Sequence, residues 1–429
     1  MPHPLDRTFD ALRGLAAPDE LRRMAAEGKA PAGRPKCNSH IHLPPNFSAF
    51  ESVEQAVAMA AEQHVRVLGV TNYYDHRVYG AFGDAARGRG VFPLFGLEII
   101  SLVEPLVRAG TLINDPNNPG RMYICGKGAV GVAAPSGRAA ELLGAIRRND
   151  TERMAEMVRR TAEVFVAAAL DTGLDTDAVI DGIVERHGCL RDSVTLQERH
   201  IAQAFQEALF RLVPAGERPA ALEKLYGKQS KCEPEDAVKI QGELRSNLLK
   251  SGRPAFVEET FLSFEQAHEL ILALEAIPCY PTLADGASPI CEFETPVDRL
   301  VGELRGRNIH MAEFIPTRNT PEVLGEYVRA MRAAGVAVVG GTEHNTLSLI
   351  GLEPTCIGGA AVPDDVKDIF WEGMCVCAAH QLLRLYGEAG FVDGSGRPNT
   401  DYATAEDRIA AFAKLGAAAI QMYFEACGE

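Results

Sequence analysis

The sequence predicts an α/β barrel that carries a large helical insertion and ends in a helical region. Short runs of β-branched and aromatic residues alternate with segments of helical periodicity, which indicates a mainly parallel sheet covered by helices. Roughly six or seven such units favour a closed or nearly closed barrel over an open sheet. Neither a G-x-G-x-x-G nor a P-loop motif follows the first strand, so dinucleotide-binding and P-loop folds lose support.

A change from alternating strands and helices to helices alone sets the expected boundaries along the chain. Residues 1–35 are expected to form a short helix and a Gly/Pro-rich connector, and residues 36–137 the first part of the barrel. Residues 138–262 follow as the helical insertion and 263–350 as the second part of the barrel. Residues 351–429 are expected to form the C-terminal helical region.

Individual elements follow from local patterns. Ser52 and Gln55 form a capping box that begins a helix. The β-branched run 65–70 is typical of a buried strand, and further strands are expected at 91–95 and 122–125. In the insertion, helices are expected at 139–170, 176–187, 195–212 and 235–250. The alternation then resumes with helices at 264–276, 297–306 and 321–334, strands at 277–283, 309–315 and 336–341, and final helices at 364–387 and 403–426.

Composition and charge restrict the class of protein. Of the 429 residues, 46% are hydrophobic and 24% charged, which is typical of a globular chain. The 43 basic and 58 acidic residues give a net charge of −15, and no run of Lys and Arg marks a nucleic-acid-binding face. No signal peptide and no membrane-spanning apolar stretch is recognisable. We therefore expect a cytoplasmic protein without nucleic-acid or membrane partners, and homo-oligomeric assembly stays open.

The ten cysteines include no C-x-x-C pair. Zinc-ribbon and thioredoxin-type sites therefore lose support, and most of these thiols are expected to be reduced, buried and apolar in character.

The sharpest local signal is an H-x-H pair, His40 and His42. Because alternate residues of a strand point to the same face, both imidazoles can converge on one metal ion. An isolated H-x-H pair is about as often two polar histidines on a surface strand, so the neighbouring strand ends decide between these interpretations.

Polar residues able to bind a metal, move a proton or hold an anion follow nearly every predicted strand. In α/β barrels the chemistry lies at the carboxyl ends of the strands. Those ends supply Asp75 with His76, then Glu98, Lys127, Thr282 with Asp285, Glu313 with Arg318, and Glu343 with His344. This coincidence predicts a functional site more strongly than any single motif.

Four segments together resemble the polymerase and histidinol phosphatase (PHP) superfamily. They are His40-Ile41-His42, Thr71-Asn72-Tyr73, Gly96-Leu97-Glu98 and Gly341-Thr342-Glu343-His344. The resemblance covers residues 36–100 and about 277–350. It implies a distorted (β/α)7 barrel that binds two or three divalent ions, often zinc, manganese or iron, and that most often hydrolyses phosphate esters.

The chain departs from the family pattern at several ligand positions. Asn72 and Tyr73 replace the Asp and His of a Thr-Asp-His element, and Tyr280 stands where the family has a His before Pro281. The ligands that carry over are His40, His42, Glu98 and His344, with His76 as a substitute ligand. We therefore expect one or two ions of zinc, manganese or iron, held in part by imidazoles of His40 and His344 that meet around a shared cation.

Candidate catalytic and substrate-binding residues surround these ligands. Asp75, Asp285 and Glu343 are candidate general bases beside a metal-activated water. Lys127, in a Gly-flanked loop, and Arg318, beside Asn319, suit an anionic group, with Tyr280 as a further substrate-binding candidate. Glu198-Arg199-His200 is expected in a helix as a local polar network, one member of which can reach over the barrel mouth as part of a lid.

Three functions fit these patterns. The first is a metal-dependent, phosphoesterase-like hydrolase that acts on a small anionic substrate through a metal-activated water. The second is a metal-dependent sugar-acid isomerase or lyase, because one metal, cationic loop residues and Tyr73, Tyr74 and Tyr280 also suit enediol chemistry. The third is a catalytically inactive protein that uses the barrel for binding or structure, since several family ligands are replaced.

Overall fold

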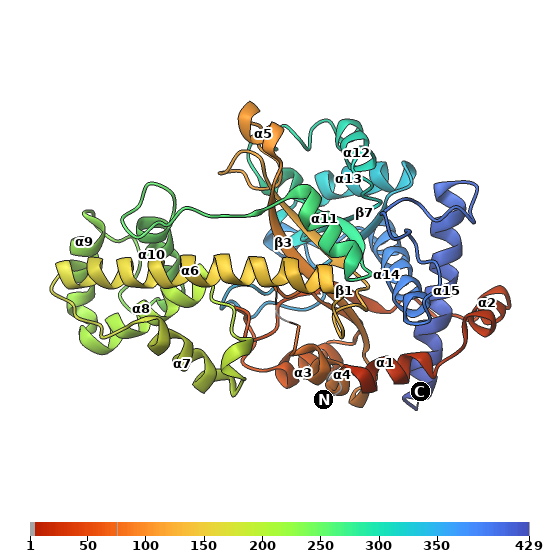
Figure 1. The fold of residues 1–429 in the computed structure, drawn as a ribbon, viewed down its shortest axis with the longest axis horizontal. Coiled ribbons are helices and arrows are strands. Elements are labelled where there is room, and N and C mark those ends of the chain that lie inside the picture. The colour runs from red at the N-terminus through yellow and green to blue at the C-terminus, as the bar shows by residue number, and fades with distance from the viewer. Residues whose placement is uncertain (1–4, 75, 429) are drawn as a thin grey trace.

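The computed structural model describes residues 5–74 and 76–428 and contains a barrel-shaped sheet covered by helices (Figure 1). The strands are β1 (Lys36–Ile41), β2 (Val65–Val70), β3 (Phe92–Leu102), β4 (Arg121–Lys127), β5 (Leu262–Ser263), β6 (Ile277–Thr282), β7 (Met311–Phe314) and β8 (Ala337–Gly340). Their order across the sheet is β1-β2-β3-β4-β6-β7-β8, and β5 pairs with β3. The structure is a mixed α/β fold, as predicted.

Backbone hydrogen bonds between the two ends of the sheet nearly close the barrel. The amide of Glu343 donates to the carbonyl of His40 at 2.8 Å, and the amide of His42 donates to the carbonyl of Glu343 at 2.9 Å. Ile41 forms an isolated parallel bridge with Glu343. The H-x-H segment and the segment after β8 therefore lie side by side, although about three hundred residues separate them in the sequence.

Strand direction is not uniform. The β1-β2-β3 and β6-β7-β8 neighbours are parallel, whereas β4 is antiparallel to both β3 and β6. In this register Cys125 pairs with Glu98 and Lys127 with Gly96. The carboxyl end of β4 therefore points to the opposite rim from the carboxyl end of β3, and Lys127 lies deeper in the barrel than Glu98.

Helices surround the sheet and fill the connection between β4 and β5. They are α1 (Asp6–Arg13), α2 (Pro18–Ala26), α3 (Val53–Glu62), α4 (Tyr79–Gly88), α5 (Glu104–Ala109), α6 (Gly137–Ala167), α7 (Thr176–His187), α8 (Glu198–Leu212), α9 (Arg218–Tyr226), α10 (Ala237–Leu244), α11 (Phe264–Ala273), α12 (Val297–Gly306), α13 (Pro321–Ala333), α14 (Asp364–Leu385) and α15 (Ala405–Ala426). Short helical turns are η1 (Arg191–Ser193), η2 (Ala215–Glu217), η3 (Arg245–Leu249), η4 (Ala284–Gly286), η5 (Pro316–Arg318) and η6 (Ile357–Gly359). No described helix is long and apolar enough to cross a bilayer.

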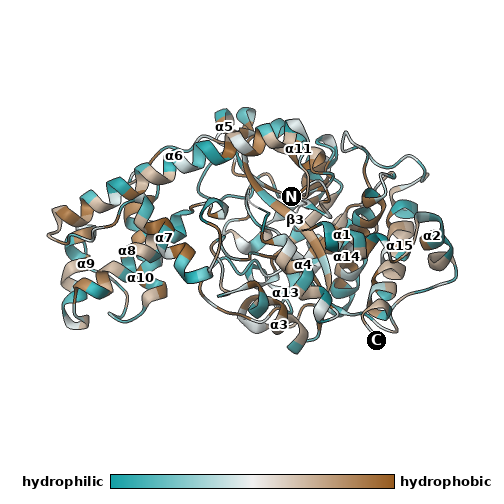
Figure 2. Ribbon diagram, turned by 60° about the horizontal axis from the view of Figure 1, so that its bottom comes forward, coloured by the Kyte–Doolittle hydropathy of each residue, from teal (hydrophilic) through white to brown (hydrophobic). Residues whose placement is uncertain are grey.

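Helices α6 to α10 gather at one end of the molecule (Figures 1 and 2). Their buried side chains form a hydrophobic cluster separate from the one around the sheet. Phe165 of α6 and Phe205 of α8 lie at its centre, with ring centroids 5.0 Å apart. Helix α6 begins at the barrel, where its first half packs against α11 and joins the cluster around the sheet, and its second half lies in the separate cluster. The amphipathic helices of this region thus bury their apolar faces mainly against one another.

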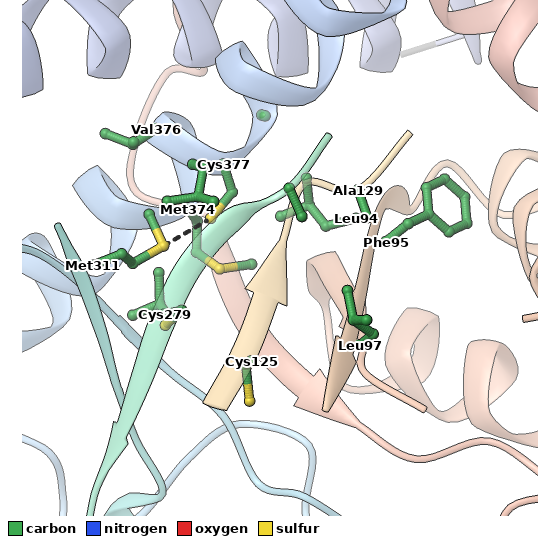
Figure 3. Packing of buried hydrophobic residues seen from close by; sticks show 14 of the residues in the cluster. Leu94, Phe95, Leu97, Cys125, Ala129, Cys279, Met311, Met374, Val376 and Cys377 are labelled. Atoms are coloured by element: carbon green, nitrogen blue, oxygen red, sulfur yellow. Dashed lines mark hydrogen bonds between the residues drawn. The ribbon is translucent and has the colours of Figure 1, made fainter. Parts of the chain in front are cut away.

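The core of the barrel is rich in sulfur (Figure 3). Cys125, Cys279, Met311 and Cys377 are buried, and the Cys377 Sγ lies 3.6 Å from the Met311 Sδ. Burial raises the pKa of the Cys377 thiol to about 12, so it stays protonated at neutral pH. No disulfide joins cysteines of the described chain. These thiols pack as small apolar groups.

Candidate metal centre

Two imidazoles and one carboxylate converge at the carboxyl end of β1 and the middle of β3. The Nε2 atoms of His40 and His42 lie 3.3 Å apart, and the Nε2 of His42 lies 3.4 Å from the Oε2 of Glu98. All three residues are buried, and one ligand atom from each lies within 4.8 Å of the others. Strand alternation aims both histidines at one face, as predicted from the H-x-H pair.

The spacing and chemistry of this group fit a divalent ion. Ligand atoms of a tetrahedral site with metal bonds of about 2.0–2.2 Å lie about 3.3–3.6 Å apart, close to the two distances above. Glu98 Oε2 is buried without a hydrogen-bond partner in the structure, although a buried polar atom normally has one. Imidazole and carboxylate ligands suit zinc, manganese and iron. The residues present therefore fit the metal that the sequence predicts.

The charge states of the ligands agree with this fit. Burial lowers the pKa of His42, so its imidazole is neutral at pH 7. Burial raises the pKa of Glu98, but the nearby His42 and His40 outweigh that effect and hold the pKa below its usual value. Neutral imidazole and ionised carboxylate are the forms that bind metal ions.

Glu313 of β7 orients the His40 ring from behind. Its Oε2 lies 2.7 Å from the Nδ1 of His40, and its Oε1 accepts from the Ser39 hydroxyl at 2.5 Å. Burial alone would raise the pKa of Glu313, but Lys127 and His40 hold it at about 2, so the carboxylate is ionised. The His40 Nδ1 therefore carries the proton, and its Nε2 lone pair faces His42 and Glu98. This carboxylate–histidine pair is the usual outer support of a metal-binding imidazole.

Lys127 supports Glu313 and does not reach the barrel mouth. Its ammonium donates to Glu313 Oε1 at 2.6 Å, to the Ser39 carbonyl at 3.0 Å and to the Thr71 hydroxyl at 3.1 Å. These bonds use all three of its protons, and the residue is only 3% exposed. The prediction that Lys127 binds substrate from a loop is wrong, because β4 runs antiparallel and places it beneath the metal centre.

His344 lies near the site, but its ring nitrogens are occupied. Its Nδ1 lies 2.7 Å from the Thr342 hydroxyl and its Nε2 lies 3.0 Å from the Ile350 carbonyl. The ring also stacks on Phe50, with centroids 4.7 Å apart. Glu343 and His344 have φ angles of 61° and 53°, a sharp turn that the barrel closure imposes. The structure therefore contradicts the prediction that the rings of His40 and His344 share a cation.

The remaining predicted ligand, His76, does not join the described metal group. It is buried, and its ring packs against Tyr79 with centroids 5.2 Å apart. The candidate ligand groups found among residues 5–74 and 76–428 do not include it. The neighbouring candidate base Asp75 lies outside the described residues.

Arg318 and Glu343 form an ion pair beside the metal centre. Glu343 Oε2 accepts from the Arg318 guanidinium and from the Asn345 amide, the latter at 2.7 Å. Burial lowers the pKa of Arg318, but Glu343 and Glu98 outweigh it and raise that pKa above its usual value. The Arg318 side chain is 41% exposed, so a ligand in solvent can reach it. Glu343 thus holds Arg318 in place, which differs from the general-base role expected from the sequence.

Asp285 and Asn319 build the loop that leads into α13. The Asp285 carboxylate accepts from the Asn319 amide at 2.9 Å and from the Thr320 amide and hydroxyl at 3.0 and 2.6 Å. Asn319 also donates to the Leu283 carbonyl at 2.6 Å and is fully buried. These bonds occupy both Asp285 oxygens. The structure therefore gives Asp285 and Asn319 structural roles in place of the predicted catalytic and substrate-binding ones.

Tyr280 faces away from the metal centre. It pairs in register with Ala312, the neighbour of the inward-facing Glu313, so it points to the opposite face of the sheet. Its hydroxyl donates to Glu294 Oε1 at 2.8 Å in a fully buried setting. The prediction that Tyr280 binds substrate is wrong, because strand alternation turns its side chain outward.

Tyr73 lies beside the metal ligands. The sequence suggests a role for its side chain only in the isomerase or lyase alternative. Its ring stacks on His42, with centroids 5.1 Å apart and an interplanar angle of 19°. Burial and then the charge of Glu98 raise its pKa well above the usual value. The hydroxyl is therefore protonated at neutral pH. The signal in the sequence is its position, since it stands where the PHP pattern has a His ligand.

Arg199 extends from α8 toward the same region. Its guanidinium carbon lies 6.0 Å from the centre of the Phe47 ring, and the Gln197 side chain accepts from the Phe47 amide at 2.6 Å. Burial, with Arg245 nearby, lowers the Arg199 pKa to about 10, so it remains cationic at pH 7. The helical region between β4 and β5 thus contacts the loop after β1.

Comparison with known proteins identifies related folds. No protein-family model matches the sequence, and no curated protein matches it. A structure from Bifidobacterium adolescentis, whose assignment as a metal-dependent phosphoesterase is provisional, aligns with a TM-score of 0.53 at 14% identity over 80% of this chain and 98% of that chain. An amidohydrolase from Chromobacterium violaceum, solved with sulfate and without metal, gives a TM-score of 0.49 at 16% identity over 78% and 96% of the two chains. The first similarity shows that the chain shares the fold of that barrel protein.

Proposed function

We propose that this chain is a divalent-metal-dependent hydrolase of small anionic phosphoesters and a divergent member of the PHP superfamily. The observation that carries the proposal is the spacing of His40, His42 and Glu98, which matches the edges of a tetrahedral metal site. The fold shared with the Bifidobacterium protein, itself described as a phosphoesterase, is consistent with this chemistry. A cytoplasmic location is part of the same proposal.

The proposed metal has three protein ligands, His40, His42 and Glu98. Three ligands leave a fourth position open, which is the pattern of catalytic sites and not of structural ones. A divalent ion supplies Lewis acidity and lowers the pKa of water toward about 7. Glu313 keeps the His40 ring oriented, so the ligand geometry is set before any metal arrives.

Arg318 is the proposed contact for the anionic group. Its planar guanidinium matches two oxygens of a phosphoryl group and keeps its charge at any physiological pH. Glu343, which itself accepts from the Asn345 amide, pairs with the side chain, and the exposed fraction of 41% leaves donors available to a ligand.

Tyr73 is the proposed hydrogen-bond donor to the reacting group. Its hydroxyl stays protonated because its pKa is raised by burial and by Glu98. A protonated phenol beside the metal ligands can donate to an oxygen on which negative charge develops. The stacking of Tyr73 on His42 fixes the direction of that donation.

Metal analysis and hydrolysis of 4-nitrophenyl phosphate test the proposal together. The wild-type chain, loaded with zinc, manganese or iron, is expected to retain close to one or two ions per chain and to hydrolyse the ester. The variant His42→Ala should lose both properties, whereas His64→Ala, at an exposed residue, should keep them.

Two results would contradict the proposal. One is a wild-type protein that retains no stoichiometric metal. The other is a metal-loaded protein that hydrolyses no phosphate ester but converts a panel of uronates, which would favour the isomerase or lyase alternative.

A further inference from the structure

Helix α8 brings a cation, Arg199, to the loop that follows β1. Its first turn is fixed to the loop after β1, because Gln197 accepts from the Phe47 amide at 2.6 Å and the His200 ring lies 5.3 Å from the Phe47 ring. Asn46, next to Phe47, accepts from the Tyr73 amide at 2.7 Å. One short chain of contacts therefore connects the start of α8 with Tyr73, the residue stacked on His42.

The Arg199 guanidinium forms no hydrogen bond or ion pair with any residue in 5–74 or 76–428. The adjacent Glu198 is already bound by Arg153 at 3.0 Å and by Lys250 at 2.6 Å. Arg199 instead lies over the Phe47 ring, within electrostatic range of Tyr73, Glu343 and Arg318.

Three guanidinium groups, of Arg199, Arg245 and Arg318, and two carboxylates, of Glu98 and Glu343, act on one another in this region, which leaves an excess of one positive charge. Arg199 and Arg318 interact electrostatically as like charges, and Glu343, which is within range of both, is hydrogen-bonded to Arg318 and Asn345. Bringing two cations together in a partly buried site costs free energy unless an anion joins them. The whole chain carries a net charge of −15, so this local excess is not a consequence of bulk composition.

We propose that Arg199 and Arg318 together bind a phosphoryl group at the barrel mouth, so that the helical region supplies half of the anion-binding site. The inference rests on the proposed function only for identifying this group as part of the substrate. Arg318 comes from the turn after β7 and Arg199 from α8, so the site exists only where both parts of the chain meet.

The structure around Arg199 preorganises this site. The Arg199 guanidinium carbon lies 6.0 Å from the centre of the Phe47 ring, at the outer limit of a cation–π contact, so its N–H groups remain available to oxygens. Arg153 bridges Glu198 and Glu259 at 3.0 and 2.9 Å, which fixes the start of α8 against α6 and the segment before β5. Less ordering free energy is then lost when the anion binds.

Calorimetric titration with inorganic phosphate tests the inference without relying on turnover. The full chain is titrated after chelation, so that no metal contributes to binding. Replacing Arg199 by Gln should weaken phosphate binding by at least about tenfold, the loss expected for one charge-assisted contact. Arg199→Lys should bind with intermediate affinity, because it keeps the charge but loses the two-point contact.

Arg211→Gln is the matched control on the same helix. Its guanidinium donates to the Thr172 carbonyl at 3.3 Å within the helical region. This variant should bind phosphate as the wild type does. Thermal midpoints and circular dichroism of Arg199→Gln and Arg199→Lys check that both variants are folded. If Arg199→Gln is not folded, the comparison of Arg199→Lys with the wild type tests the inference.

Equal phosphate affinity of wild type and folded Arg199→Gln would overturn the inference, as would a wild-type protein that binds no phosphate at millimolar concentration. The two proposals fail separately. Arg199-dependent phosphate binding by a protein without hydrolase activity would refute the proposed function alone. If the protein hydrolyses the ester but the wild type and Arg199→Gln bind phosphate equally well, this inference alone would be refuted.

Discussion

At the scale of single residues, Glu313 determines which ring nitrogen of His40 is free to bind a metal ion. The ionised Glu313 carboxylate accepts a hydrogen bond from the Nδ1 of His40, which leaves the Nε2 lone pair facing His42 and Glu98. Lys127 keeps that carboxylate ionised in the barrel interior. Because the Glu313 and Lys127 charges are buried, removing either one leaves the other unpaired and lowers the free energy of unfolding.

Glu313→Gln is expected to lower stability by about 3–5 kcal/mol, since it leaves the Lys127 ammonium buried without its counter-charge. It should also weaken metal binding about 10–100-fold, because His40 loses its orienting carboxylate. Urea unfolding and metal titration measure the two effects. The double variant Glu313→Gln with Lys127→Met should recover much of the stability but not the metal affinity. Recovery of both would show that Glu313 has no role in orienting His40.

Tyr73→Phe keeps the ring that stacks on His42 and removes only the hydroxyl. Phosphoester hydrolysis should fall by about 10²–10³-fold, the usual effect of removing one donor to developing negative charge. Metal content should stay at the wild-type value. Tyr74→Phe, the buried neighbour, serves as control and should keep its activity. Loss of metal from Tyr73→Phe would mean that the hydroxyl supports the ligands and not the reacting group.

The site residues that the sequence predicted correctly depend on local properties, and those that it predicted incorrectly depend on non-local ones. His40, His42 and Glu98 came from strand alternation and strand-end position, which are local properties, and the structure brings them together. His344 and Tyr280 were misassigned, because a left-handed turn in one case and the register of a neighbouring strand in the other decide where the side chain points. Neither feature is visible in residue spacing.

At the scale of elements, strong periodicity gave accurate bounds. The strand expected at 65–70 and the helices expected at 176–187 and 297–306 match β2, α7 and α12. Strand β3 extends to Leu102, beyond the expected 95, because antiparallel pairing with β4 continues along its whole second half. Parallel and antiparallel strands share the same side-chain alternation, so the direction of β4, and with it the depth of Lys127, was not predictable.

The start of α8 contains a buried histidine that makes stability depend on pH. Burial, with His187 and Arg186 nearby, lowers the pKa of His200 to about 3, while in the unfolded chain it is about 6.5. Its contribution to stability is therefore complete above about pH 6.5 and is lost as pH falls toward about 3. At pH 5 the loss amounts to about 2 kcal/mol relative to pH 7.

Urea unfolding at pH 7 and pH 5 measures this loss. His200→Gln should lose about 2 kcal/mol less than the wild type between these pH values, whereas His64→Gln, at an exposed position, should follow the wild type. Identical pH dependence in wild type and His200→Gln would show that His200 is not held neutral in the folded protein.

At the scale of the whole molecule, the barrel and most of helices α6 to α10 have separate hydrophobic clusters but meet at the loop after β1. The barrel supplies His40, His42, Glu98 and the support beneath them. The helices supply Arg199 above the Phe47 loop. The alternation of strands and helices predicted the barrel, while the proposed pairing of Arg199 with Arg318 around an anion depends on packing across segments more than one hundred residues apart.

Anomalous diffraction from crystals of the zinc- or manganese-loaded protein tests the metal centre most directly. We expect a strong anomalous peak about 2.0–2.2 Å from the Nε2 atoms of His40 and His42 and from a carboxylate oxygen of Glu98. The peak should disappear in Glu98→Gln and persist in Glu104→Gln, a change at an exposed residue of α5. A metal-loaded crystal without density between these three side chains, or with its ion on His344 instead, would contradict the account.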